Sequence, residues 1–383
     1  MLRGPFGQHA ATLRMLPTIE AHMNIGTPRE RRPDDNRVGL TPAWIQLLTA
    51  DGHHCYVERG AGLGAGFEDE DFARAGAHIV YSGEEAYGRA DLVVKVARPT
   101  SEELAWLRRG QAVMAFWHLA SASPDNLETL LREQITAIAL ETVQADDGSL
   151  PVLTPMSQIA GRMSASVAAG LLRNDRGGKG ILLGGVPGVP PAEVAILGAG
   201  VVGTYAARAF AGLGAKVYVL DHDMTRLERI ANLDERVITM TSNALNIGKV
   251  VRFADVLIGA VLVPGQRTPV LVTREMVRLM RPRSVILDVA VDQGGCVETS
   301  RPTTHRTPTF LEEGVIHYCV PNMSGVLGRT ATYALTNATW PFIHLLSHAG
   351  ADAAIAQNTA LARGVATHAG QVVAAGLGGR AAR

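Results

Sequence analysis

Cysteine is scarce in this chain of 383 residues. Cys55, Cys296 and Cys319 lie far apart, are odd in number and have no CxxC spacing. This distribution argues against a disulfide framework and against a cysteine-ligated zinc site. We therefore expect three reduced thiols, a cytoplasmic location and no metal site.

Net charge and long apolar runs are also absent. The 36 Lys and Arg residues balance 36 Asp and Glu residues, which argues against a nucleic-acid partner because such proteins present a basic surface. No apolar run reaches the roughly 18 residues needed to span a bilayer, so we expect no membrane segment. Residues 1–22 lack the continuous apolar stretch of a signal peptide, and we expect them to be a disordered extension.

Short apolar runs alternate with amphipathic stretches in the first half of the chain. Residues 91–95, 112–116 and 135–140 predict buried strands, whereas residues 42–49 and 101–109 have helical spacing. This alternation is typical of βαβ units, which form parallel sheets covered by helices. The first half is therefore predicted to be an α/β domain.

The second half begins with a long predicted helix at residues 157–173, which crosses from one domain to the next. The Gly/Pro-rich segment 184–191 is typical of a hinge or of a cofactor-facing loop. A regular α/β pattern follows. Its predicted strands are 194–197, 217–220, 256–258, 285–289 and 317–320, and its predicted helices are 204–213 and 330–348, the last returning to the first domain.

A glycine-rich turn separates the strand at 194–197 from the helix that follows. Gly198, Gly200 and Gly203 form a GxGxxG pattern around Val201 and Val202. The first glycine suits a tight turn, the second lets the backbone approach a pyrophosphate, and the third lets the helix pack on the strand. A pyrophosphate would then lie at the helix N-terminus, where amide donors favour an anion.

An acidic residue, Asp221, ends the next predicted strand about 20 residues further on. Its carboxylate can accept hydrogen bonds from both ribose hydroxyls and would repel a 2′-phosphate, so the pattern predicts NAD rather than NADP. Arg226 lies close enough in sequence to weaken that preference. A glycine turn without a ligand is the alternative, and the strand, helix and acidic residue together argue against it.

Polar residues that could carry chemistry lie at or near predicted strand ends, which face the ligand crevice in open α/β sheets. Arg37 could bind a carboxylate through its fork of donors, and Lys95 could pair with the same carboxylate or polarise a carbonyl. His118 could exchange a proton near neutral pH, and Asp292 could orient water or ammonia. Each residue taken alone also fits a structural role, as a surface ion pair, a strand-end lysine, a core histidine or a turn aspartate.

At these residues the chain resembles the alanine dehydrogenases, in the family that also contains the NAD-binding subunit of proton-translocating transhydrogenase. The resemblance covers nearly the whole chain, from about residue 25 to about residue 370. The motifs that carry it include residues 25–30 (IGTPRE), 36–42 (NRVGLTP), 91–96 (DLVVKV), 118–120 (HLA), 141–143 (ETV), 184–189 (GGVPGV) and 288–295 (DVAVDQGG).

The resemblance implies NAD-dependent oxidative deamination of L-alanine to pyruvate and ammonia, and the reverse reaction. It implies that Arg37 and Lys95 bind the substrate and that His118 and Asp292 are the catalytic pair. It also implies a homohexamer. The cofactor contacts that it adds to the glycine turn are Ser157, Asp221, Arg226, Asn322 and Met323.

The fold implied by the resemblance is a pair of Rossmann-like, doubly wound α/β domains. The NAD domain at 151–328 is inserted into a discontinuous substrate domain formed by 1–150 and 329–383.

The chain departs from the family pattern at three places. Ala97-Arg98-Pro99 replaces a Lys-Glu-Pro run, Trp117 replaces a smaller residue, and two prolines are missing from 324–328, which we expect to loosen that loop. These changes leave two alternatives open. One is a related dehydrogenase or imine reductase for another small or modified amino acid, and the other is a transhydrogenase-like NAD-binding subunit. An opine-type dehydrogenase would need a second carboxylate site, which the sequence does not reveal.

Overall fold

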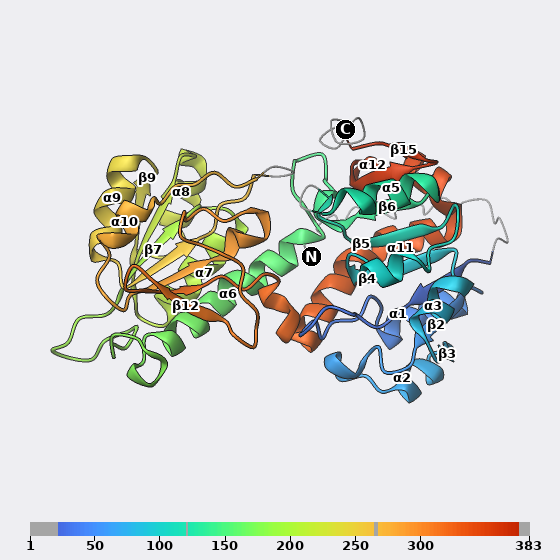
Figure 1. Ribbon diagram of the computed structural model, residues 1–383, viewed down its shortest axis with the longest axis horizontal. Helices are drawn as coiled ribbons and strands as arrows, with labels where there is room; N and C mark the ends of the chain where they lie inside the picture. Colours follow the sequence, from blue (N-terminus) through green and yellow to red (C-terminus); the bar gives the residue numbers. More distant parts are fainter. Residues whose placement is uncertain (1–21, 120–121, 264–266, 375–383) are drawn as a thin grey trace, which may run out of the picture.

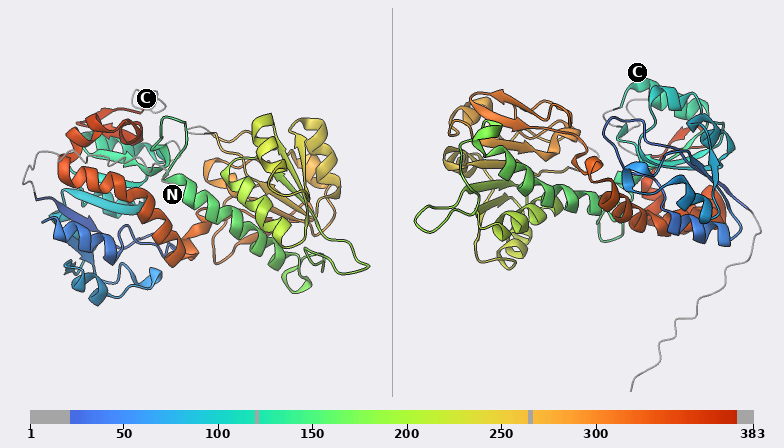
Figure 2. Two further views of the ribbon diagram at one scale, coloured as in Figure 1. Left: turned by 180° about the vertical axis from the view of Figure 1, so that it is seen from behind. Right: turned by 90° about the horizontal axis from the view of Figure 1, so that it is seen from below.

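The computed structural model describes residues 22–119, 122–263 and 267–374. The predicted disorder of residues 1–22 lies outside these ranges, apart from His22. The chain forms two α/β lobes, and α6 together with the start of α11 runs between them (Figures 1 and 2).

The first lobe contains a doubly wound sheet. Among the described residues its strand order is β15-β14-β6-β5-β4-β1-β2-β3. Strands β1 through β6 are parallel to one another, and β14 and β15 add an antiparallel edge next to β6. The last two strands come from the C-terminal part of the chain, so this sheet is built from both ends of the sequence. The strands are β1 (Asn24–Thr27), β2 (His54–Glu58), β3 (His78–Val80), β4 (Leu92–Ala97), β5 (Ala112–Phe116), β6 (Thr136–Ala139), β14 (Val365–His368) and β15 (Gln371–Val372).

The second lobe repeats the same winding. Its described strands lie in the order β12-β13-β11-β10-β7-β8-β9, parallel except for the edge strand β12. The predicted α/β class and the two Rossmann-like domains are therefore confirmed. The strands are β7 (Glu193–Leu197), β8 (Lys216–Asp221), β9 (Val237–Thr241), β10 (Val256–Gly259), β11 (Val285–Asp288), β12 (Thr309–Glu312) and β13 (Val315–Tyr318).

Helices cover both faces of each sheet, and the central strands β4 and β5 are accordingly buried along their whole length and apolar except for Lys95, as parallel strands usually are. The helix predicted at 101–109 is shorter than expected: it ends at Leu104, and turns lead from there through Gly110 (φ 78°) to β5. The helices are α1 (Pro42–Ala50), α2 (Asp69–Arg74), α3 (Gly83–Arg89), α4 (Ser101–Leu104), α5 (Pro124–Arg132), α6 (Leu153–Leu171), α7 (Val201–Gly212), α8 (Met224–Ala231), α9 (Ala244–Phe253), α10 (Arg274–Arg278), α11 (Gly328–Gln357) and α12 (Thr359–Gly364). Within the described ranges, no helix is both long and apolar enough to cross a membrane.

Strand order reverses once in each sheet, between β1 and β4 in the first lobe and between β7 and β10 in the second. In open α/β sheets, ligands bind beyond the carboxyl ends of the strands at such a reversal. The carboxyl ends of strands from both lobes border one shared cavity, so the topology itself locates the candidate site.

Candidate active site

A cavity of about 190 Å³ lies between the lobes and brings together residues from both. Seven residues predicted from the sequence line it: Arg37, His118, Ser157, Val202, Asp292, Asn322 and Met323. Other lining side chains that matter below are Arg32, Ala97, Phe116, Met156 and Ser324.

Arg37 is held by a buried carboxylate that the sequence analysis did not single out. The Asp35 oxygens accept hydrogen bonds from Arg37 Nε at 2.8 Å and from Nη2 at 2.6 Å. Although burial alone would raise the pKa of Asp35, the neighbouring guanidinium holds it below its ordinary value. Nη1 contacts Ser324 Oγ at 3.3 Å and Met156 Sδ at 3.5 Å. The guanidinium is thus fixed in orientation at the cavity wall.

His118 follows β5 with a positive φ of 44°, a conformation that is costly for a non-glycine residue and tends to occur at functional sites. The Glu141 carboxylate accepts the His118 amide at 2.5 Å and the Trp117 amide at 3.1 Å, which stabilises this turn. The imidazole stacks on Phe116, with ring centroids 6.0 Å apart. Glu141 is therefore a positioning residue, and the ETV motif was the sequence signal for it.

Asp292 lies across the cavity in a short 3-10 helix, Val289–Gln293, which follows β11. Its Oδ2 accepts the amide of Asn322 at 3.4 Å. Asp292 is exposed at the cavity. Partial desolvation there raises its pKa above the ordinary value, while His118, Arg32 and Arg37 oppose this effect. The carboxylate thus lies at the same cavity as the His118 imidazole and the arginines of the other lobe.

Lys95 is buried and is not among the residues that line this cavity, so its predicted substrate contact stays a prediction without support from the structure. Its Nζ donates to Glu103 Oε1 at 2.8 Å and lies 3.2 Å from Glu30 Oε2, and its side chain is 1% exposed. Burial alone would lower the pKa of Lys95, but the two carboxylates raise it. The pairing of β4 with β5 slips between Val94 and Ala97, and Ala97 is the residue that faces the cavity.

Two of the departures from the family pattern, Trp117 and the segment 324–328, do not loosen or reshape the cavity in the structure. The Trp117 side chain is fully buried in the core and donates from Nε1 to Val113 O at 3.3 Å, so it does not shape the cavity directly. The segment expected to be loosened forms a 3-10 helix, Met323–Val326, in which Ser324 and Gly325 are buried. A Cβ on Gly325 would lie 2.7 Å from Asn322 Nδ2, so this segment is tightly packed.

Arg98 and Arg32 add positive charge beside the site. Arg98 is half-buried, and its Nη1 donates to the His118 carbonyl at 3.4 Å. Burial and the nearby Arg32 both lower the pKa of Arg98. Within the described ranges, neither arginine has a carboxylate oxygen within 4.0 Å. An acidic group entering the cavity would therefore meet Arg32, which lines it without such a partner, with Arg98 close by at the His118 carbonyl.

The glycine turn has the geometry that a dinucleotide requires. Gly198 has φ 105°, and a Cβ there would lie 2.5 Å from Ala260 O. A Cβ on Gly203 would lie 1.8 Å from Gly198 O, so this position tolerates only glycine. At Gly200 no atom lies within 4 Å of the Cβ position, which leaves open space in front of the α7 N-terminus. This space fits an approaching pyrophosphate.

Asp221 ends β8 and is buried beside this turn, its Oδ2 accepting the Ala199 amide at 2.6 Å. Arg226 instead pairs with Asp223, with 3.3 Å between Nε and Oδ2. The predicted contact Val201 is the first residue of α7 and is 37% exposed. A carboxylate therefore lies at the end of this strand, next to the place where the ribose hydroxyls of a dinucleotide would bind.

Two doubly wound domains that face a common cavity, one of them with a glycine turn and an acidic strand end, define a dinucleotide-type dehydrogenase. The comparisons with known proteins give the family. The profiles described as Alanine dehydrogenase/PNT, N-terminal domain and C-terminal domain match residues 26–160 and 164–375. The chain belongs to the alanine dehydrogenase/PNT family and is an amino-acid dehydrogenase.

Individual relatives agree with this assignment. The alanine dehydrogenase of Methanococcus maripaludis is 47% identical over 352 residues, which cover 91% of this chain and 94% of the relative. A solved L-alanine dehydrogenase superposes with a TM-score of 0.89 at 46% identity, covering 94% of this chain and 99% of that one. A transhydrogenase from Sinorhizobium meliloti, 24% identical with a TM-score of 0.78, covers 91% of this chain and 99% of that one, and shares the fold.

Proposed function

We propose that this protein is an NAD-dependent alanine dehydrogenase, which converts L-alanine, NAD⁺ and water to pyruvate, ammonium, NADH and a proton, and runs in reverse. The observation that carries the proposal is that Arg37 and His118 of the first lobe and Asp292 of the second line one cavity, together with Val202 of the glycine turn. The names of the similar proteins support alanine as the substrate.

Substrate binding is assigned to Arg37. Its guanidinium is buried, oriented by Asp35 and directed through Nη1 toward Ser324, so it can bind a carboxylate without first reorganising. This fixes the α-carbon of the amino acid between the lobes, beside Val202 and Ala260 at the switch point of the second sheet. NAD⁺, when bound, accepts a hydride from that carbon.

Proton transfer is assigned to His118 and Asp292. Loss of hydride from the α-carbon leaves an imine, which must take up water and then release ammonia. His118 can take a proton from the attacking water and return it to the departing amine. Asp292 opposes the positive charge that His118 acquires, and it can orient the water or the ammonia.

Residues 1–150 with 329–383 are proposed as the substrate domain, because Arg37 and His118 lie there. Residues 151–328 are proposed as the NAD domain, with Ser157, Asn322 and Met323 beside the nicotinamide end. The homohexamer, the cytoplasmic location and the lack of nucleic-acid and membrane partners stay predictions.

Cofactor choice gives a first test. Asp221→Ser removes the carboxylate that would repel a 2′-phosphate, so the ratio of kcat/KM for NADP to that for NAD should rise about 10-fold or more. Steady-state kinetics with both cofactors measure it. The matched control is Asp223→Ser, because serine can cap α8 in its place and Asp223 is bonded to Arg226 rather than to the turn. An unchanged ratio in Asp221→Ser would refute the ribose assignment.

The substrate is tested by supplying a panel of L-amino acids with NAD⁺ and following NADH formation. We expect L-alanine to give the highest kcat/KM, because the cavity of about 190 Å³ leaves little room beyond the nicotinamide end. Absence of turnover with alanine, together with strong turnover of another amino acid, would overturn the alanine assignment.

A second candidate is a dehydrogenase for an amino acid with a second acidic group. Arg32 and Arg98 beside the cavity favour it, and Ala97 there leaves space where the family has a lysine. If this second candidate is correct, an acidic amino acid should give the highest kcat/KM in the panel. Arg98→Ala should then lower kcat/KM for that substrate about 10-fold or more, while the exposed Arg109→Ala leaves it unchanged.

A further inference from the structure

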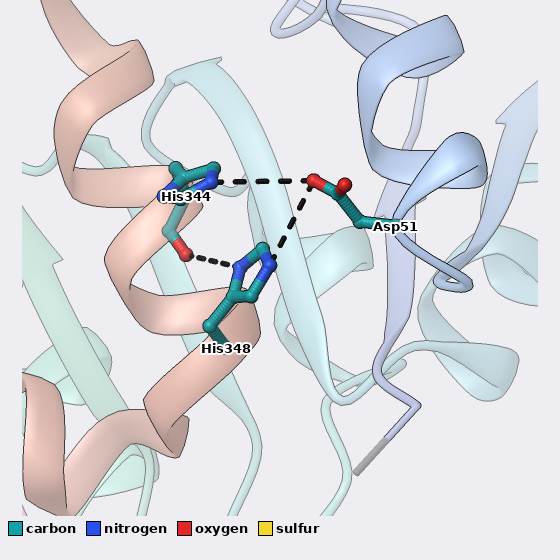
Figure 3. A group of neighbouring side chains, drawn as sticks. All are labelled: Asp51, His344 and His348. Carbon is teal, nitrogen blue, oxygen red and sulfur yellow. Dashed lines mark hydrogen bonds and ion pairs between the residues drawn. The ribbon is translucent and has the colours of Figure 1, made fainter. Parts of the chain in front are cut away.

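Two histidines of α11 and the aspartate that follows α1 form a cluster on the outside of the first lobe (Figure 3). His344 and His348 are four residues apart and so share one face of the helix. Asp51 projects toward both from the end of α1. One possible ligand atom from each of the three lies within 4.8 Å of the others, and none of the three lines the cavity.

The distances in this cluster suit a shared cation better than direct hydrogen bonds. Asp51 Oδ2 lies 4.0 Å from His344 Nε2 and 3.7 Å from His348 Nε2, both beyond hydrogen-bond length. Neighbouring ligands of a tetrahedral ion with bonds of about 2.0–2.1 Å are about 3.4 Å apart. The two carboxylate–imidazole distances lie within about 0.6 Å of this value, so small side-chain rotations would bring the ligands onto one ion.

The ring of His348 is already oriented for metal binding. Its Nδ1 lies 2.9 Å from the His344 carbonyl oxygen, to which the neutral ring can donate its proton. In that tautomer the unprotonated Nε2 faces Asp51 and can bind a metal ion. A hydrogen bond from Nδ1 to a backbone carbonyl commonly orients a metal-ligating histidine.

His53 lies behind the cluster and supports it. This buried ring packs edge-on against His348, with centroids 4.9 Å apart. Its Nδ1 accepts the Met23 amide at 3.3 Å, so the neutral ring carries its proton on Nε2 and is not a ligand. The side chains of Asp51, His344 and His348 are 41%, 49% and 39% exposed, so an ion can reach them from solvent.

We propose that Asp51, His344 and His348 bind a divalent first-row transition ion, for which Zn²⁺ is the probe, with water in the fourth position. Two imidazoles and one carboxylate suit Zn²⁺, whereas Mg²⁺ prefers an octahedral set of oxygens. The bound ion would tie the end of α1 to α11. The sequence analysis expected no metal because it considered cysteines, and Asp51 lies far from the two histidines along the chain.

The test is calorimetric titration of the untagged, chelator-treated full chain with Zn²⁺. We expect His344→Gln/His348→Gln to lose one zinc site, and Asp51→Asn to weaken that site about 10-fold or more. His368→Gln is the matched control, because His368 faces Asp352 at 3.4 Å as a single ion pair and should leave the titration unchanged. Mg²⁺ should not compete with Zn²⁺.

Thermal unfolding gives a second readout. Zn²⁺ at 100 times its Kd should raise the Tm of the natural chain by about 3 °C or more, but not that of the double variant. Metal-free Tm and alanine turnover equal to those of the natural chain would show that the double variant is folded. If the double variant is unstable, Asp51→Asn serves alone. Equal zinc stoichiometry and affinity in the natural chain and the variants would overturn the proposal.

Discussion

His118→Ala is expected to lower kcat with alanine by about 10²-fold or more, because it removes the group assigned to proton transfer at the imine carbon. NADH should still bind, since the glycine turn and Asp221 lie in the other lobe. Stopped-flow and steady-state kinetics measure the first effect, and fluorescence titration with NADH measures the second.

The positive φ of residue 118 calls for a second variant. Asparagine adopts the left-handed region more readily than alanine does, so His118→Asn removes the imidazole with less backbone strain. Both variants should lose turnover to a similar degree, whereas the exposed His78→Ala should behave like the natural chain. Activity within about 3-fold of the natural chain in His118→Asn would refute the proton-transfer role.

Lys95→Met is expected to destabilise the fold by about 3–5 kcal/mol, because it leaves the buried Glu30 and Glu103 without their cation. The free energy of unfolding should fall in a urea titration. In the protein that remains folded, KM for alanine should be near its natural value, since the Lys95 side chain does not reach the cavity.

Lys249→Met is the control for this experiment, because it removes an exposed lysine from α9 and should change stability little. The reverse result in Lys95→Met, an unchanged free energy of unfolding with a large rise in KM, would support the substrate-binding role predicted for Lys95. The triple variant with Glu30→Gln and Glu103→Gln should recover part of the lost stability, because it removes both unpaired charges.

Much of the fold was predictable because its signals are local. The strand at Ala112–Phe116 was predicted to the residue from its apolar run, and the turn at Gly198 from glycines next to a strand. Strands with mixed exposure were missed, such as the edge strand β12, because a half-exposed strand lacks a continuous apolar run. The strand predicted at 317–320 begins two residues earlier, at Val315.

The site was less predictable, since its geometry depends on contacts between distant segments. Lys95 was placed by counting along an apolar run, and that count assumes a regular strand. The slip in pairing between Val94 and Ala97 inserts an extra residue, which changes the side that the following residues face. The carboxylates that hold Lys95 come from a loop and from a helix, and no spacing rule connects Glu30 or Glu103 with it.

The contact between the lobes has a consequence for affinity. Asn322 donates to Asp35 at 3.0 Å, and the Gly325 carbonyl accepts the Asn36 amide at 2.9 Å, so separating the lobes breaks both bonds. Arg37 also contacts Ser324 of the same segment, so the substrate-binding arrangement belongs to the population in which the lobes are closed. The apparent dissociation constant of the substrate then equals its intrinsic value divided by the closed fraction. A substitution at Asn322 would therefore change that fraction in addition to any contact that Asn322 makes within the cavity.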